Sequence, residues 1–137
     1  MGGPAVVDGQ RIPATDNFLQ CSFVIDGRTW ISCEQYFQAC KFPDTSDAFA
    51  KIVKERDGLA QWTIGRNARG VRTDWDEVRV DVMYRANYEK FFQCPSLLAE
   101  LLATGTGAFS LHATSDFWAV WNAKILTVVR EQLRRYA

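Results

Sequence analysis

The sequence predicts an α+β fold: a mainly helical single domain with a small N-terminal β-hairpin or sheet. The length of 137 residues is ordinary for one domain and too short for two domains with separate cores. Hydrophobic residues make up 47% of the chain, enough for a core without disulfides or metal. A strand-like pattern precedes residue 32, and helical patterns follow it. We therefore expect one domain over residues 1–137, with a flexible stretch at 1–14.

The strand-like part is a candidate hairpin. Residues 22–32 place an Asp26-Gly27 turn between two short apolar runs, which is typical of a two-residue β-hairpin loop. Ser32 then provides an N-cap for a first helix over Cys33–Phe42, which should stop at Pro43.

The rest of the chain predicts a series of helices. Gly and Pro residues separate the helical segments, and Pro95 suits the first turn of one of them. Gly105-Thr-Gly107 is interpreted as a turn, because it lacks the lysine and the strand-loop-helix context of a phosphate-binding loop. The expected helices cover residues 46–56, 59–66, 74–93, 96–103 and about 116–135.

The composition excludes several classes of function. Sixteen basic residues balance sixteen acidic ones, which argues against broad binding to DNA or to a membrane. The one histidine, His112, cannot build a zinc cluster, and no carboxylate pattern resembles a calcium loop, so we expect no metal and no cofactor. The four cysteines form no C-x-x-C pair, and the chain shows no signal peptide. We therefore expect free thiols and an intracellular location, cytoplasmic or nuclear.

The first predicted helix carries the clearest chemical pattern. At 100° per residue, Glu34, Gln38 and Lys41 lie along one stripe. In a pocket, the carboxylate could act as an acid or base, and the amine could bind phosphate or attack a carbonyl carbon. The alternative is a solvated face, which spacing alone favours, because charged helix faces usually point to water.

A basic segment and a tryptophan pair are further candidates. Residues 65–75 contain three arginines and Trp75 ahead of a helix start, a pattern that suits phosphate binding or, equally, a basic surface loop. Trp118 and Trp121 could stack on a base, although tryptophans at helical spacing more often belong to a core.

Taken together, these segments resemble the NADAR (YbiA-like) N-glycosidase family. Asp16-Asn17-Phe18, the hairpin around Asp26-Gly27 and the helix S-C-E-Q-Y-F-Q-A-C-K-F at 32–42 are similar to the opening motifs of that family. Gly65-Arg66, the R-x-D-W segment at 72–75, and V-M, K-F and L-L-A-T-G farther along follow in the same order. The resemblance covers most of residues 16–135.

The resemblance implies hydrolysis of an N-glycosidic bond between a phosphorylated ribose and a base. Members of the family remove ADP-ribose from guanine or cleave phosphoribosylaminouracil intermediates of riboflavin synthesis. The residues that match catalytic positions are Glu34, Lys41, Trp75 and Trp118. Those that match positions in contact with the substrate are Asn17, Phe18, Gln38, Arg66, Arg72 and Asp74, to which we add Asp116 and Trp121.

The resemblance weakens after residue 111. Ala119 and Ala123 stand where the family has glycines, so the pocket wall is expected to differ in shape, and His112 is a candidate replacement for a missing acid. Three functions follow: hydrolysis of ADP-ribosylated guanine, hydrolysis of riboflavin intermediates, and non-catalytic binding of ADP-ribose or NAD. We expect a monomer that binds ADP-ribose or another ribose phosphate, with ADP-ribosylated nucleic acid as a candidate substrate and no membrane partner.

Overall fold

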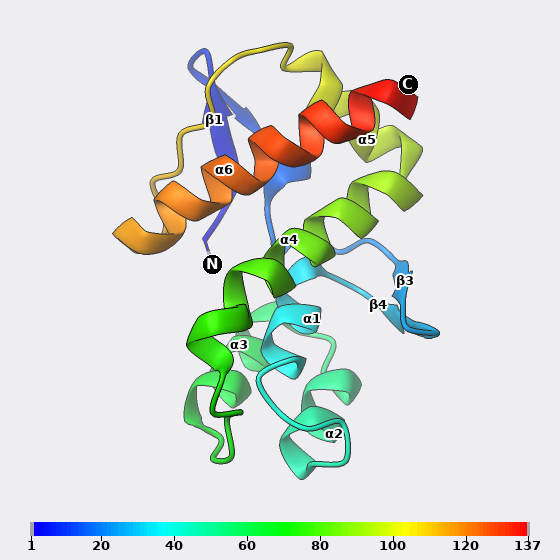
Figure 1. The fold of residues 1–137 in the computed structure, drawn as a ribbon, viewed down its shortest axis with the longest axis vertical. Coiled ribbons are helices and arrows are strands. Elements are labelled where there is room, and N and C mark those ends of the chain that lie inside the picture. Colours follow the sequence, from blue (N-terminus) through cyan, green and yellow to red (C-terminus); the bar gives the residue numbers. More distant parts are fainter. Residues whose placement is uncertain (1, 137) are drawn as a thin grey trace.

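The computed structural model describes residues 2–136, and two short hairpins and six α-helices account for most of them (Figure 1). The first hairpin joins β1 (Ala5–Val7) to β2 (Gln10–Ile12), and the second joins β3 (Phe23–Ile25) to β4 (Arg28–Trp30). The helices are α1 (Cys33–Ala39), α2 (Asp47–Lys54), α3 (Gly58–Asn67), α4 (Trp75–Gln93), α5 (Pro95–Ala103) and α6 (Asp116–Leu133). Short 3₁₀ turns occupy Pro13–Thr15 and Arg134–Tyr136. The predicted α+β class is confirmed.

The second hairpin forms where the sequence predicts it. β3 and β4 pair antiparallel, with Phe23 opposite Trp30 and Ile25 opposite Arg28. Asp26 and Gly27 have φ angles of 53° and 74°. Positive φ at both central residues is the geometry of the tight hairpin turn that an Asp-Gly pair favours.

The first hairpin differs from the sequence-based expectation. Within the stretch 1–14 that we expected to be flexible, residues 5–12 pair as antiparallel strands, and Ala5 and Val7 are buried in the core. Met1 lies outside the described residues. Val6 also forms an isolated bridge with Ser110, which connects this hairpin to the segment before α6. The turn of this hairpin is Asp8-Gly9, with φ angles of 50° and 78°, the same residue pair as in the second hairpin, and we did not use that signal when we expected residues 1–14 to be flexible.

The helix positions agree with the predictions, with small differences at the ends. Ser32 caps α1 by accepting a hydrogen bond from the backbone N–H of Gln35. The helix ends at Ala39, before the predicted limit, and the chain then turns through Phe42. The last α-helix ends at Leu133, and a 3₁₀ turn follows it.

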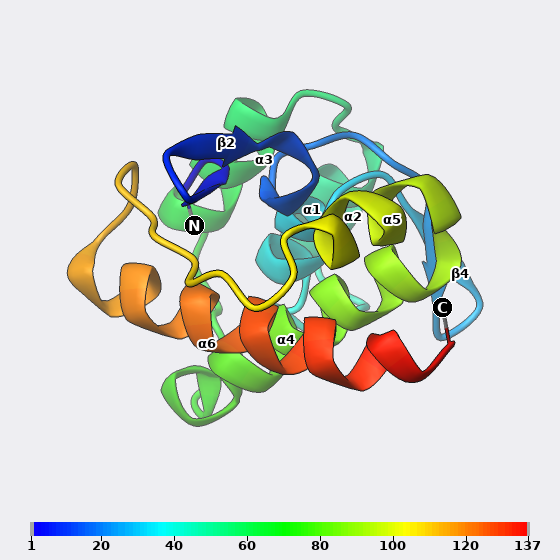
Figure 2. The same ribbon diagram turned by 90° about the horizontal axis from the view of Figure 1, so that it is seen from above.

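The α1 helix lies near the centre of the molecule (Figure 2). It packs against α2, α3 and α4, and all seven of its residues are buried. The α2 and α3 helices lie at one end of the molecule, whereas β1, α5 and α6 lie at the other (Figure 1). The α4 helix runs between the two ends and packs against α1, α5 and α6.

A buried lysine ties α4 to the segment before the second hairpin. Lys90 is fully buried, and its Nζ donates hydrogen bonds to the carbonyl oxygens of Ala14, at 2.8 Å, and Asp16, at 3.4 Å. An ammonium group buried this deeply needs acceptors, because its desolvation is otherwise costly. The bonds therefore fix the backbone that leads into Asn17 and Phe18.

The cysteines and the helices bear on other expectations. The four cysteines are free thiols, and burial raises the pKa of Cys21 to about 12 and that of Cys33 to about 11. Neither thiol is therefore ionised near neutral pH. Among residues 2–136, no helix combines the length and apolarity that crossing a lipid bilayer requires.

Candidate functional site

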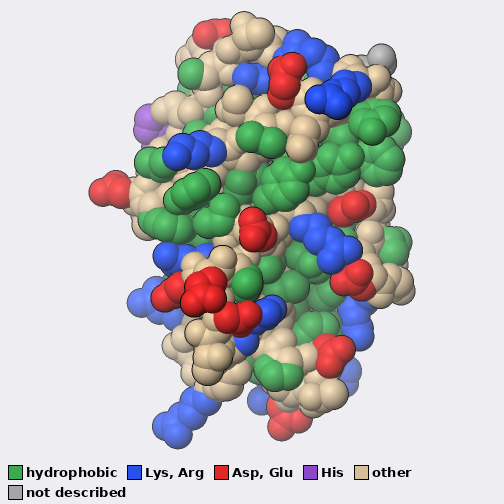
Figure 3. All heavy atoms as spheres, in the orientation of Figure 1, with side chains coloured by type: hydrophobic (Ala, Val, Ile, Leu, Met, Phe, Trp, Pro, Cys, Tyr) green, Lys and Arg blue, Asp and Glu red, His purple; other side chains and the backbone are tan. Residues whose placement is uncertain are grey.

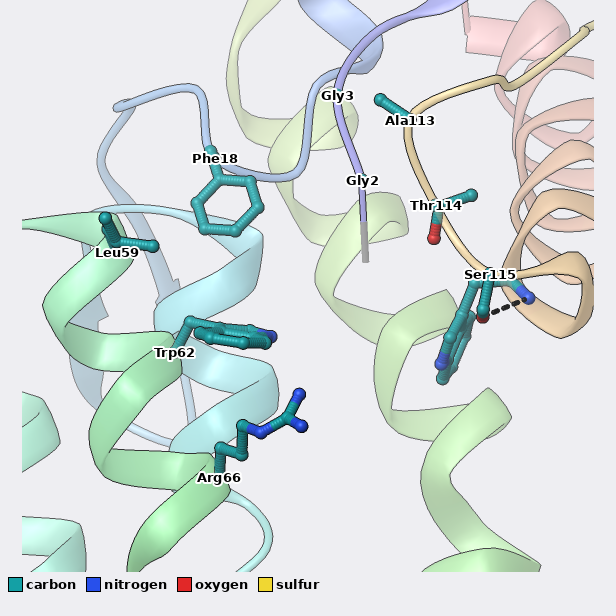
Figure 4. Close-up of a pocket in the computed structure, with 10 residues that line it drawn as sticks. Gly2, Gly3, Phe18, Leu59, Trp62, Arg66, Ala113, Thr114 and Ser115 are labelled. Atoms are coloured by element: carbon teal, nitrogen blue, oxygen red, sulfur yellow. Dashed lines mark hydrogen bonds between the residues drawn. The ribbon is translucent and has the colours of Figure 1, made fainter.

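A cavity of about 470 Å³ opens between α3 and the loop that precedes α6 (Figure 4). This volume lies in the range of pockets that hold small organic ligands. The lining residues are Gly2, Gly3, Phe18, Leu59, Trp62, Arg66, Ala113, Thr114, Ser115 and Trp118.

One wall of the cavity combines aromatic rings with a cation. Trp62 and Arg66 are one turn apart on α3, and the Arg66 guanidinium lies 5.1 Å from the centre of the Trp62 ring. Phe18 lies beside them on the same wall (Figure 4). Its ring rests against Gly58, where an added Cβ would come within 2.8 Å of Phe18 Cδ1. This wall therefore offers flat surfaces for stacking and a fork of donors for an anion.

The opposite wall is the start of α6 and the loop before it. Ser115 caps this helix, and its hydroxyl accepts a hydrogen bond of 3.4 Å from the backbone N–H of Trp118. The indole of Trp118 is buried, yet it contributes to the cavity lining. Helix N-termini attract anions, although the exposed Asp116 in the first turn opposes that attraction here.

Glu34 is fully buried on α1. Its Oε1 accepts a hydrogen bond of 2.7 Å from Gln38 Nε2, and its Oε2 is a buried atom with no hydrogen-bond partner within residues 2–136. Burial raises the pKa of Glu34 above its ordinary value of 4.5, and the hydrogen bond from Gln38 opposes that shift. A carboxyl group with one oxygen unused and a raised pKa is suited to proton transfer.

Lys41 lies just beyond the end of α1 and is partly buried. Burial lowers the pKa of its amine, the nearby Glu34 carboxylate raises it, and Arg66 lowers it further. A lowered pKa increases the fraction of neutral amine, which is the nucleophilic form. The predicted stripe of Glu34, Gln38 and Lys41 thus faces the protein interior, and the solvated alternative is wrong for Glu34 and Gln38, which are both fully buried.

Phe37 connects this stripe to the two predicted tryptophans. The Phe37 ring lies edge-on to Trp75, with centres 4.9 Å apart, and edge-on to Trp118, with centres 5.2 Å apart. The amine of Lys41 is 5.8 Å from the centre of the same ring. Trp118 belongs to both this aromatic group and the cavity. Asn17, whose carbonyl accepts a hydrogen bond from the N–H of Glu34, directly precedes the lining residue Phe18. The α1 helix therefore borders the cavity, although Glu34 and Lys41 do not line it.

Asn17 has a positioning role in this structure. Its backbone carbonyl accepts a hydrogen bond of 2.9 Å from the N–H of Glu34, and its side-chain oxygen accepts one of 3.1 Å from Asn87 Nδ2. Asn17 is buried and lies next to the cavity residue Phe18. It therefore fixes the first turn of α1 relative to the cavity wall.

Other predicted residues lie farther out. Arg72 and Asp74 are bound to each other, with Nε–Oδ1 at 2.6 Å and Nη2–Oδ2 at 2.9 Å. The backbone N–H of Arg72 donates to the carbonyl of Lys41, so this pair borders the end of α1. Trp121 lies in a separate groove between α4 and α6. The exposed His112 contacts Ser110 at 3.1 Å and does not line the cavity.

Two aromatic residues of this region, Trp62 and Phe37, are among those that were not predicted from the sequence. Trp62 has a usable signal, because it stands four residues before Arg66 and therefore on the same face of a helix. Phe37 has none, because a buried phenylalanine on a helix is ordinary and its two aromatic neighbours come from distant segments.

Gly65 generates the first testable prediction. An added Cβ at this position would overlap the side-chain oxygen of Gln38. Glycine to alanine inside a helix normally stabilises by roughly 1 kcal/mol. For Gly65→Ala we expect the opposite, a fall of about 1–3 kcal/mol in the free energy of unfolding, because the core must shift. Chemical denaturation measures it, with Thr63→Ala, exposed on the same helix, as the control; a more stable Gly65→Ala variant would contradict the packing described.

The buried carboxyl group generates a second prediction, on the pH dependence of stability. Because its pKa is raised in the folded state, the stability contributed by protonated Glu34 is complete below pH 4.5 and is lost as the pH rises through the folded-state pKa. Glu34→Gln removes this loss. We expect the variant to melt at a higher temperature than the parent at neutral pH, and the difference to vanish at pH 4. Equal melting temperatures at both pH values would show that the carboxylate is fully compensated.

Comparisons with known proteins agree with the family resemblance. A family model described as the NADAR domain matches residues 7–134. A riboflavin biosynthesis protein of Vibrio vulnificus is 34% identical over 131 residues, which are 88% of this chain and 35% of that protein. N-glycosidase YbiA of Escherichia coli is 34% identical over 104 residues, 74% of this chain and 64% of YbiA.

The fold agrees as well. The NMR structure of E. coli YbiA matches with a TM-score of 0.81 and 30% sequence identity, over 90% of this chain and 79% of that chain. The chain thus spans about a third of the Vibrio protein and 64% of YbiA. With a family model matched along nearly its whole length and a neighbour that shares its fold, the chain belongs to the NADAR domain family.

Proposed function

We propose that this chain is an N-glycosidase that hydrolyses the bond between a phosphorylated ribose and a nitrogen base. The observation that carries the proposal is the buried Glu34 carboxyl group, with one oxygen unused, close to Lys41 and beside a cavity lined by aromatic rings and Arg66. The relative from E. coli is named an N-glycosidase, which supports the same reaction class.

In this proposal Glu34 is the general acid or base. Departure of the base builds positive charge on the anomeric carbon, which a nearby carboxylate stabilises. Burial raises the pKa of the same group, which increases its protonated fraction. The protonated form can give its proton to the departing nitrogen, and the ionised form can activate water. Gln38 holds one carboxyl oxygen and leaves the other for the substrate.

Lys41 is proposed to act at the ribose C1 region. Protonation of the ring oxygen opens the ribose ring and leaves C1 bound to the base as an iminium. The neutral amine of Lys41 adds to C1, and the base nitrogen takes a proton and departs, which gives a Schiff base. Water then hydrolyses the Schiff base to the ribose aldehyde and the free amine. Burial lowers the pKa of Lys41 and so increases the neutral amine that this step needs. Trp75 and Trp118, held edge-on to Phe37, are proposed to exclude water from the reacting centre.

The substrate that we propose is an ADP-ribosylated guanine. Such a molecule has two bases and a pyrophosphate, and the cavity has aromatic surfaces from three separate segments, Phe18, Trp62 and Trp118. The Arg66 guanidinium suits the negative charge of the pyrophosphate. Arg72 and Asp74, at the edge of the same region, are proposed as outer contacts, and Asp116, at the start of α6, as a contact near the ribose.

A second candidate substrate is a phosphoribosylaminouracil intermediate of riboflavin synthesis. The Vibrio relative, named a riboflavin biosynthesis protein, favours it. This compound has a single base and a single phosphate, so it would use fewer of the aromatic surfaces of the cavity.

Product analysis by mass spectrometry distinguishes these substrates. The parent protein and Glu34→Gln are each incubated with ADP-ribosylated guanosine and, separately, with the phosphoribosylaminouracil. We expect the parent to release ADP-ribose from the first compound, and Glu34→Gln to be at least ~100-fold slower, the usual cost of losing a general acid or base. Glu100→Gln, on the exposed face of α5, is the matched control.

Each other result has a distinct meaning. Cleavage of the uracil compound alone would assign the chain to riboflavin metabolism. If the protein cleaves neither compound but still binds ADP-ribose, the proposed enzymatic function is wrong, and the chain is a non-catalytic binding module.

The role of Lys41 has its own test. Sodium borohydride added during turnover reduces a Schiff base to a stable secondary amine, so we expect a covalent ribose-phosphate adduct at Lys41 in the intact mass and in peptide maps. Lys41→Arg should lose both the adduct and the activity, whereas Lys51→Arg, an exposed lysine on α2, should keep both. Full activity of Lys41→Arg without any adduct would exclude covalent catalysis by this residue.

A further inference from the structure

An exposed apolar face along α4 and α6 takes no part in the proposed catalytic site. Hydrophobic side chains form a band along α6 and beside α4 (Figure 3). Large apolar side chains on this face have high exposed fractions, 52% for Val120, 46% for Val128, 50% for Phe92 and 67% for Tyr136. Contiguous exposure of this kind on a folded domain usually marks a contact surface.

A groove of about 170 Å³ runs through the middle of this face. Its lining is mostly apolar and consists of Val80, Asp81, Tyr84, Trp121, Lys124, Ile125 and Val128. The two charged residues stand on opposite sides of it, Asp81 on α4 and Lys124 on α6, and both are exposed. Neither belongs to an ion pair among residues 2–136, and the amine of Lys124 lies 4.6 Å from the centre of the Trp121 ring.

The arrangement of charges is self-complementary. A two-fold axis that passes through the groove, midway between Asp81 and Lys124, exchanges the two sides. It therefore places the Asp81 carboxylate of each copy over the Lys124 ammonium of the other. The same operation places the apolar lining of one groove against that of the second, where it is removed from water.

The lengths of the two helices set the size of this face. The α4 helix has 19 residues and α6 has 18, so each is roughly 27 Å long at a rise of 1.5 Å per residue. Two such helices packed 8–10 Å apart present a face roughly 20 Å wide. The flat area of that face is roughly 540 Å², and the relief of the side chains raises its accessible area above the flat value, towards the ~800 Å² per partner that stable interfaces bury.

We propose that a second copy of this chain occupies the α4–α6 face, which gives a two-fold symmetric dimer with two reciprocal Asp81–Lys124 ion pairs. This dimer replaces the monomer expected from the sequence, and it does not depend on the proposed enzymatic function. The cavity between α3 and the start of α6 has none of the groove residues in its lining, so both copies can bind ligand.

A charge-exchange experiment tests this geometry by sedimentation velocity over a wide range of concentration. The parent should sediment with twice the 15.6 kDa mass of one chain. Asp81→Lys alone and Lys124→Asp alone should each lose the dimer, because each brings like charges together at both ends of the two-fold. Mixed in equal amounts, the two variants should regain it, since a copy with two lysines at these positions then faces a copy with two aspartates. Glu100→Lys, away from this face, should leave the dimer unchanged.

Three results would overturn the proposal. The first is a parent that stays monomeric at all concentrations, and the second is a pair of variants that dimerise as well as the parent does. The third is a mixture that remains monomeric although circular dichroism shows each variant folded. In the first case the face would be covered by another partner or left in water.

Discussion

The constraint on which this structure depends is the complete burial of α1, a helix that carries a carboxyl group and three other polar side chains. A buried polar group needs a partner, because its desolvation otherwise costs several kcal/mol. Neighbouring segments supply these partners. The Ser32 hydroxyl caps the helix, and the Asn17 carbonyl accepts a hydrogen bond from the N–H of Glu34. In α2, the carbonyls of Ile52 and Val53 accept hydrogen bonds from the side-chain amide of Gln35. What stays unsatisfied, Glu34 Oε2 and Gln38 Oε1, lies on the stripe proposed for chemistry. Both of the unsatisfied polar atoms of α1 therefore lie on the same stripe of the helix.

The groups proposed for chemistry and those suited to ligand recognition lie on different elements around the cavity. Burial raises the pKa of Glu34 and lowers that of Lys41. Both shifts favour the neutral form of the side chain. The groups suited to recognition, Trp62 and Arg66, stand on the more open wall formed by α3. Phe37 is the link, since it touches the two tryptophans that begin α4 and α6.

Much of this could be predicted from the sequence, and the failures have physical causes. Helix caps, an Asp-Gly turn and hydrophobic spacing are local signals, so the second hairpin and all six helices were located within a few residues. The direction in which a helix stripe faces is a tertiary property, and for α1 spacing alone favoured the wrong side. The β1–β2 hairpin was missed although its Asp8-Gly9 turn has positive φ angles like those of Asp26-Gly27, because the stretch 1–14 was expected to be flexible. Trp121 was grouped with Trp118 by proximity in sequence, yet three residues along a helix are enough to separate a cavity wall from the α4–α6 face.

The contacts of α4 have a consequence for how the chain tolerates changes in length. At its start, Trp75 meets the aromatic group around Phe37, and near its end Lys90 holds the carbonyls of Ala14 and Asp16, just before Asn17 and Phe18. These two points are roughly 22 Å apart along α4, at 1.5 Å per residue. The length of this one helix therefore fixes the distance between the aromatic group around Phe37 and the backbone that precedes Asn17. A single inserted or deleted residue would rotate one end by 100° relative to the other, so the chain can vary in its loops but not in the length of this helix.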